Sequence, residues 1–154
     1  MRGMTATVCV YGVAALVSLR GSIAEAQTFV GRWVRQDTPT PMTMTVEVCC
    51  GGGRRLTYHL SMNNGNEMTL MVETALDGKD APVLMGGKPT GQTMAIRQLD
   101  DRHAAAILKM NGQQYGTARG TLSADGKTLI VEDDYTAAAA GQSVGKQKET
   151  WIRK

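Results

Sequence analysis

The feature that most constrains this chain is an alternation of apolar and polar residues with a period of two. In residues 42–49, every even position is Met or Val, and every odd position is Thr, Glu or Cys. This pattern is typical of a β-strand with one buried face, because successive strand side chains point to opposite sides. Helical periodicity is hard to find beyond residue 27, so the sequence predicts an all-β fold.

Similar segments recur along the chain and are separated by short turns. We expect strands at residues 29–34, 42–49, 55–62, 68–76, 93–99, 104–110, 113–122, 128–135 and 148–153. Asn64-Gly65 and Asn111-Gly112 favour type I′ hairpins, since both residue types tolerate positive φ. Residues 77–91 carry Pro82, Pro89 and four glycines, and they are predicted to form one long irregular loop.

Consecutive hairpins favour an antiparallel up-and-down barrel, because closure removes the exposed edges that an open sheet would leave. We therefore predict one domain over residues 27–154, an all-β barrel of about 8–10 strands. The last strand, at Trp151-Ile152-Arg153, would return to the side of the first.

The first 26 residues have the pattern of a secretory signal peptide. Arg2 precedes an apolar run over residues 8–19, and Ala24-Glu25-Ala26 supplies a small-x-small cleavage pattern before Gln27. That run is shorter than the roughly 20 residues that span a bilayer as a helix. We predict a signal-peptide helix cleaved after Ala26, and a periplasmic or secreted protein without stable membrane insertion.

The charge distribution argues against nucleic acid as a partner. The formal net charge is +3, and the charged residues, 20% of the chain, are scattered along it. A nucleic-acid surface needs a concentrated basic patch or many aromatic stacking platforms, and aromatic residues make up only 5%. We expect no nucleic-acid partner and a monomeric protein.

Cys49 and Cys50 are the only cysteines outside the predicted signal peptide. In an oxidising compartment they could form a vicinal disulfide; the alternative is two free thiols at a strand end. No other metal ligand is near them in sequence. Residues 132–134 (Glu-Asp-Asp) lack the spacing of a calcium loop and are predicted to be a solvated strand face. No metal and no cofactor is therefore expected.

The chain shows no catalytic constellation. His59 and His103 are its only histidines, and neither accompanies a serine or cysteine in a recognisable nucleophile motif. The sequence therefore predicts no enzyme.

The inward-facing side chains are the candidates for ligand binding. Methionine is flexible and polarizable, so it suits pockets for varied apolar ligands; filling of the core is the alternative role. In a simple register Tyr58, Tyr115 and Arg119 also point inward. The predicted ligand-binding residues are Met44, Val46, Tyr58, Leu60, Leu70, Met94, Leu108 and Tyr115.

Gly31-Arg32-Trp33 on the first strand and Arg153 on the last are the residues by which the chain resembles the lipocalin-like, or calycin, barrels. It also resembles small exported bacterial proteins of that type through Phe-x-Gly-x-Trp at residue 29, Asp-Gly-Lys-Asp-x-Pro-Val at residue 77 and Ser-x-Asp-Gly-Lys-Thr-Leu at residue 123. The resemblance implies that Arg153 stacks on the Trp33 indole near the closed end of the barrel.

These observations favour an exported, non-enzymatic protein that holds a small, largely apolar ligand inside the barrel. The alternative is a protein-binding module, such as a periplasmic protease inhibitor, that would use residues 36–42 or 77–91 as its contact surface. An enzyme is a third class that no residue pattern supports.

Overall fold

The computed structural model describes residues 28–154, so the predicted signal peptide and its cleavage site lie outside the described residues. The described part contains ten strands and no helix. The strands are β1 (Gly31–Arg35), β2 (Met42–Cys49), β3 (Gly53–Ser61), β4 (Glu67–Thr74), β5 (Asp77–Met85), β6 (Lys88–Gln98), β7 (His103–Met110), β8 (Gln113–Leu122), β9 (Thr128–Tyr135) and β10 (Gly145–Arg153).

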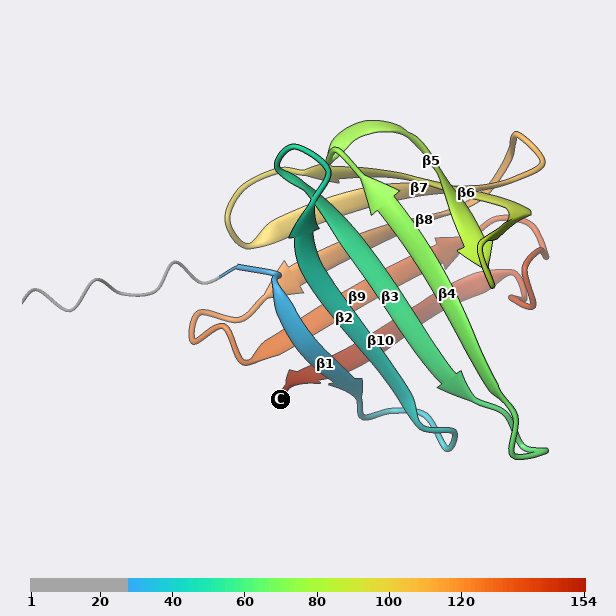
Figure 1. The fold of residues 1–154 in the computed structure, drawn as a ribbon, viewed down its shortest axis with the longest axis horizontal. Helices are drawn as coiled ribbons and strands as arrows, with labels where there is room; N and C mark the ends of the chain where they lie inside the picture. Colours follow the sequence, from blue (N-terminus) through green and yellow to red (C-terminus); the bar gives the residue numbers. More distant parts are fainter. Residues whose placement is uncertain (1–27) are drawn as a thin grey trace, which may run out of the picture.

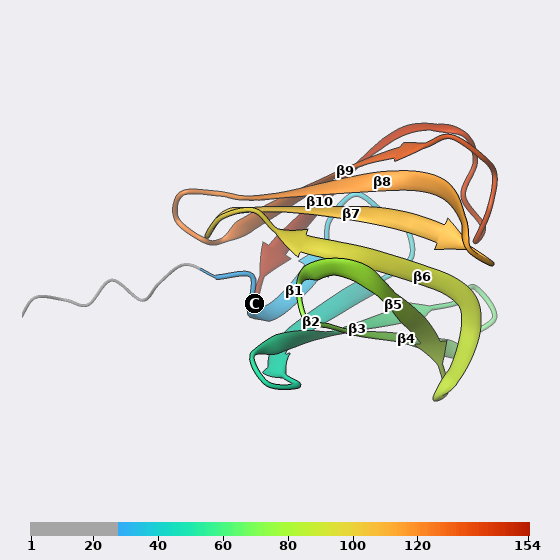
Figure 2. The ribbon, with the colours of Figure 1, turned by 90° about the horizontal axis from the view of Figure 1, so that it is seen from above.

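The ten strands form one closed barrel in which each strand is antiparallel to both of its neighbours. Chain neighbours pair with each other, and β10 returns to pair with β1 (Figures 1 and 2). The register of β1 and β10 places Trp33 opposite Arg153. The predicted all-β, up-and-down barrel of 8–10 strands is confirmed. Among the described residues, no helix is long and apolar enough to cross a membrane.

Arg153 joins the first and last strands at one end of the barrel. Its guanidinium carbon lies 4.3 Å from the ring centroid of Trp33, which is completely buried. The same guanidinium donates hydrogen bonds to the carbonyls of Thr28, Val30 and Gly126. Trp33 Nε1 donates to the Phe29 carbonyl at 2.9 Å, so residues 28–30 are held across this end of the barrel.

The prediction of a long loop over residues 77–91 is wrong. This segment forms β5, a two-residue turn and the start of β6. Gly86 and Gly87 both have positive φ, which glycine adopts without strain and which the two-residue turn requires. Pro82 lies where β5 has no partner in β4, because only residues 83–85 pair with β4, and it stands beside a register shift in the β5–β6 pairing. Such irregular, half-paired positions are where a strand tolerates proline. A protein contact here would be made by a hairpin rather than by a loop.

One of the two predicted type I′ turns is confirmed. Asn111 and Gly112 both have positive φ and join β7 to β8. At Asn64-Gly65 only the glycine has positive φ. There the Gly65 amide donates to the Met62 carbonyl, and the Met62 amide donates to the Asn66 carbonyl. The β3–β4 connection is therefore a three-residue turn.

The prediction that Arg119 points inward is also wrong, because β8 contains a β-bulge. The register between β7 and β8 skips Tyr115, which lies beside Leu108 as an extra residue. Inserting one residue reverses the alternation of side chains along the rest of the strand. Tyr115 and Ala118 are therefore both buried, whereas Arg119 is exposed on the outer face.

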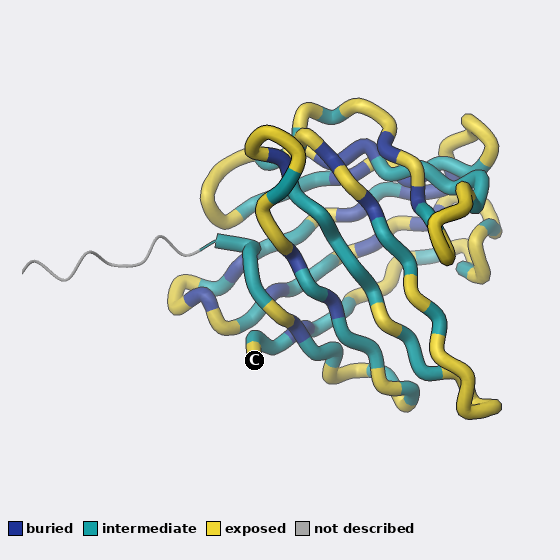
Figure 3. Tube along the Cα trace, in the orientation of Figure 1, coloured by how far each residue is buried: buried dark blue, intermediate teal, exposed yellow. Residues whose placement is uncertain are grey.

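Buried and more exposed positions alternate most clearly along β4, β5 and β9 (Figure 3). The largest completely buried side chains are Trp33, Trp151 and Leu122, and they pack together near the end closed by Arg153. Ile96, Leu108, Tyr115 and the residues around them form a second cluster. A third cluster comprises Val72, Ala81 and Val83.

Replacing Arg153 should test how far closure depends on this one side chain. Arg153→Ala removes three charge-assisted hydrogen bonds and the stacking on Trp33, so we expect the free energy of unfolding to fall by about 3 kcal/mol. Arg119→Ala, the same change on the outer face, should lower it by less than about 0.5 kcal/mol. Urea unfolding followed by tryptophan fluorescence measures both. Equal losses would show that Arg153 has no special role.

Candidate functional site

The barrel interior contains two chambers that its side chains do not fill. The larger has a volume of about 270 Å³ and the smaller about 120 Å³. Met44, Tyr58, Ala118 and Val131 line both chambers and therefore form the boundary between them. Ligand sites in proteins are concave and mostly apolar, so these chambers are the candidate functional site.

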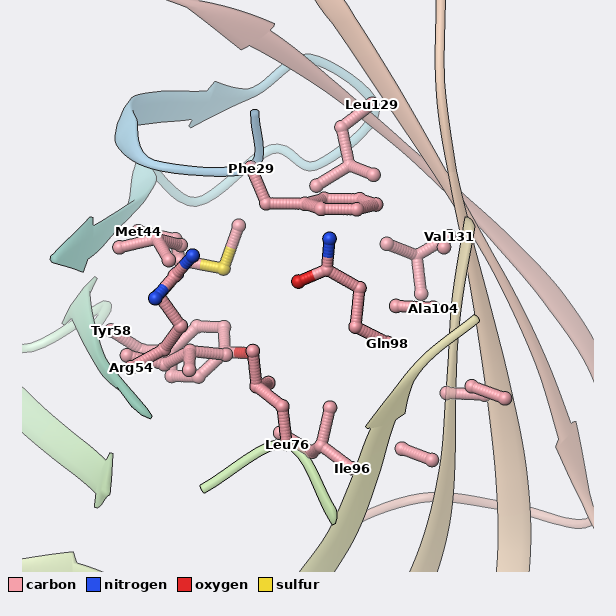
Figure 4. A pocket seen from close by; sticks show the side chains of 16 residues that line it. Phe29, Met44, Arg54, Tyr58, Leu76, Ile96, Gln98, Ala104, Leu129 and Val131 are labelled. Carbon is pink, nitrogen blue, oxygen red and sulfur yellow. The ribbon is translucent and has the colours of Figure 1, made fainter. Parts of the chain in front are cut away.

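The smaller chamber lies toward the end of the barrel that residues 28–30 cover. The Phe29 ring projects into it next to Leu129, and Met44 lies across the chamber from Val131 (Figure 4). Its walls are largely apolar, but the Gln98 amide and the Arg54 guanidinium also point into it (Figure 4). Arg54 donates to the carbonyls of Gly52 and Gly53 at 2.9 Å, which holds its charge beside the β2–β3 turn.

The larger chamber extends toward the other end of the barrel, under the loop that joins β9 to β10. Ala140 and Gln142 of that loop line it, together with residues from the strands. The apolar part of its wall includes Met42, Leu60, Met68, Leu70, Val72, Val83, Met94 and Leu108. Three of these are methionines, whose unbranched side chains adapt to ligands of different shape.

All eight residues that the sequence predicted to bind a ligand lie on a wall of one chamber or the other. Met44 and Tyr58 line both, and Val46 lines the smaller one. Leu60, Leu70, Met94, Leu108 and Tyr115 line the larger. The structure thus brings them together, and their contact with a ligand stays a prediction.

The larger chamber also has a polar wall, formed by Arg35 and Glu149, which the sequence did not reveal. Arg35 Nη1 lies 2.8 Å from Glu149 Oε1, and Arg35 Nε lies 2.8 Å from Asp37 Oδ1. The second carboxylate oxygen of Glu149 accepts a hydrogen bond from Trp151 Nε1 at 2.9 Å. The charges of Arg35 and Glu149 therefore neutralise each other, and their further hydrogen bonds hold the Asp37 and Trp151 side chains in place.

Asp133 lies on the wall of the larger chamber, so the prediction of a solvated face for residues 132–134 is wrong at its central position. Its side chain follows the inward phase of Leu129, Val131 and Tyr135, and the residue is only 6% exposed. Glu132 and Asp134 are exposed, as predicted. The alternation continued through Leu129 and Val131 was the signal that could have identified Asp133.

Burial raises the pKa of Asp133 to about 7, because the charged carboxylate loses its hydration. The negative charge of Glu149 raises this pKa further, while Arg35 and the Tyr135 hydroxyl lower it. No salt bridge within residues 28–154 involves Asp133. At neutral pH the chamber therefore holds a carboxyl group that changes readily between its neutral and charged forms.

Three tyrosines complete the polar surface of this chamber. Burial raises the pKa values of Tyr58, Tyr115 and Tyr135, so all three remain neutral hydroxyl groups. The rings of Tyr115 and Tyr135 stack with their centroids 6.1 Å apart. Gln92 Nε2 donates a hydrogen bond to the Tyr115 hydroxyl oxygen. These hydroxyls can position a ligand, but they cannot neutralise a charge.

Cys49 and Cys50 are joined by a disulfide at the turn between β2 and β3. Their sulfur atoms lie within 4.8 Å of a Glu73 carboxylate oxygen. Glu73 pairs with Arg55 at 2.6 Å, and disulfide sulfurs offer no thiolate, which is the form that binds metals. This group is therefore not a metal site while the disulfide is intact.

Comparison with known proteins supports the fold and gives no family for this chain. No protein-family model and no curated protein matches the sequence. Among solved structures, the barrel is similar to a variant of the fluorescent protein UnaG, with a TM-score of 0.56 and 11% sequence identity. The similarity covers 82% of this chain and 96% of that one. It shows that the two proteins share a barrel fold.

Burial of Asp133 should make the stability of the protein depend on pH. Between about pH 4 and pH 7 the unfolded carboxyl has lost its proton and the folded one retains it, so stability falls as the pH rises through this range. Asp133→Asn removes the titrating carboxyl and, with it, this dependence of stability on pH. Relative to the parent, its free energy of unfolding should rise by about 4 kcal/mol from pH 4 to pH 8. Asp134→Asn, on the exposed face, should show no such rise in urea titrations.

The disulfide should be detectable in the peptide that carries Cys49 and Cys50. Without reductant, this peptide from the denatured protein should resist alkylation and should be two hydrogen masses lighter than its dithiol form. After reduction, both cysteines should be alkylated. Mass spectrometry of a proteolytic digest measures both states. Alkylation before reduction would favour the two free thiols instead.

Proposed function

We propose that this protein is an exported, non-enzymatic carrier that binds a small, largely apolar molecule in the barrel interior. The larger chamber is the primary site, and the smaller one can receive part of a longer ligand if Tyr58 or Met44 moves. Export rests on the signal-peptide pattern of residues 1–26 alone.

The observation that carries this proposal is the larger chamber itself. The diameter of a barrel grows with its number of strands, and the interior of an eight-stranded barrel is just wide enough for side chains to fill, so a barrel of ten strands leaves more room. Here the chamber of about 270 Å³ is close to the lower end of the roughly 300–1,000 Å³ that is usual for ligand pockets. Apolar and methionine side chains with a few polar groups line it, as they do in most small-molecule sites.

The chemistry of the walls favours binding over catalysis. None of the described residues that line the two chambers is a serine, cysteine or histidine. Asp133 has a perturbed pKa, but it has no nucleophile beside it to activate. A buried titratable group in an apolar chamber suits recognition of a polar group on a ligand.

Native mass spectrometry of protein purified gently from its own host tests the carrier function. We expect an added mass that disappears on denaturation, and its value identifies the class of ligand. A bare protein that also fails to bind any member of a lipid panel would contradict the proposal. Pull-down experiments would then test the protein-binding alternative at residues 36–42.

Filling the chamber with a side chain should abolish binding while the barrel stays folded. Ala118→Phe adds a ring at the boundary of the two chambers, so we expect at least a tenfold loss of affinity for the apolar fluorophore N-phenyl-naphthylamine. Thr117→Phe adds the same ring on the outer face of β8 and should bind like the parent. Fluorescence titration gives the affinities, and circular dichroism checks the fold. Equal weakening in both variants would place the fluorophore outside the chamber.

A further inference from the structure

The charges of the larger chamber do not balance around Asp133. The Arg35 guanidinium is the cationic group on the chamber wall, and it already contacts Glu149 and Asp37 at 2.8 Å each. Glu149 in turn accepts a hydrogen bond from Trp151. Two carboxylates thus share one arginine, and Asp133 is a third carboxyl that no cationic side chain of residues 28–154 contacts within salt-bridge distance.

The groups that face Asp133 from the surrounding strands cannot compensate its charge either. They are Arg35 of β1, Tyr58 of β3, Tyr115 of β8, Tyr135 of β9 and Glu149 of β10. The tyrosines are neutral, and the Glu149 charge opposes ionisation of Asp133. A buried carboxylate without a partner is costly, because its lost hydration is not replaced. Only the space of the chamber is left to supply a partner.

We infer that the larger chamber prefers ligands with a cationic head group, such as a protonated alkylamine, which the Asp133 carboxylate would contact while the apolar tail lies against the methionine-rich wall. This inference rests on the proposed carrier function and adds the class of ligand. A cation beside Asp133 would supply the missing positive charge. The two opposite charges would then offset part of each other's cost of burial, which a carboxylate ligand could not do.

The same wall disfavours ligands with a carboxylate head. A carboxylate in the chamber would need the Arg35 guanidinium, which Asp37 and Glu149 already hold. It would also lie near the charges of Glu149 and Asp133, and like charges in a buried site repel strongly. A neutral alcohol head falls between the two, since the tyrosine hydroxyls and a protonated Asp133 can bond to it.

Three ligands with the same tail separate these cases. Decylamine, decanol and decanoate are titrated against protein expressed from the full sequence, with displacement of N-phenyl-naphthylamine as the readout. At pH 8 we expect decylamine to bind at least tenfold more tightly than decanol, and decanoate more weakly than decanol. The advantage of decylamine should shrink toward pH 6, where Asp133 takes up its proton.

Two variants assign the preference to one side chain. Asp133→Asn keeps the size of the residue and removes the charge, so it should still bind decanol and lose the preference for decylamine over decanol. Asp134→Asn, one residue away on the outer face, should keep that preference. Decanol binding depends on an intact chamber, so loss of decanol binding identifies a variant that has misfolded.

Two failures are distinguishable. If decanol binds and decylamine gains nothing, or if Asp133→Asn keeps the amine preference, the inference is wrong and the carrier function stands. If none of the three ligands displaces the fluorophore and Ala118→Phe changes nothing, the carrier function fails and the inference fails with it.

Discussion

The contact between Arg153 and Trp33 is the interaction on which the rest of the barrel depends. It joins the last strand to the first, and its hydrogen bonds to Thr28 and Val30 hold the residues before β1 across one end. Because the sheet is closed, every strand has a partner on both sides and the inward side chains face the barrel interior. Closure therefore creates the interior in which any ligand must be held.

How that interior is filled follows from the size of its side chains. The two tryptophans pack near the end that Arg153 closes, and Phe29 is the only phenylalanine of the chain. Around the other positions, alanine, valine, leucine and methionine leave two chambers that meet at Tyr58 and Ala118. The chamber next to the closed end is nearly apolar, whereas the other contains Arg35, Glu149 and Asp133. A ligand would thus meet different chemistry at its two ends.

Much of this could be predicted from the sequence, because period-two patterns and turn residues are local signals. The alternation in residues 42–49 and the turn at Asn111-Gly112 identified elements that the barrel contains. The prolines of residues 77–91 misled the prediction, since whether a missing N–H matters depends on which partner strand lies beside it. The Arg119 side chain points outward because of a β-bulge at Tyr115. No residue type near Tyr115 indicates such a bulge in the sequence.

The sequence by itself determined the fold class and the strand periodicity, since alternation and turn chemistry act over a few residues. The closure pair, Trp33 and Arg153, was expected only from the family resemblance, because its two residues lie at opposite ends of the barrel sequence. Only the tertiary structure decided which polar groups enter the chamber and which of them are neutralised. Arg35, Asp37 and Glu149 are far apart in the chain, and their pairing arises where β1 meets β10. Among residues 28–154, no cationic side chain lies within salt-bridge distance of Asp133. Charge balance is thus decided by the closed barrel and not by any single strand.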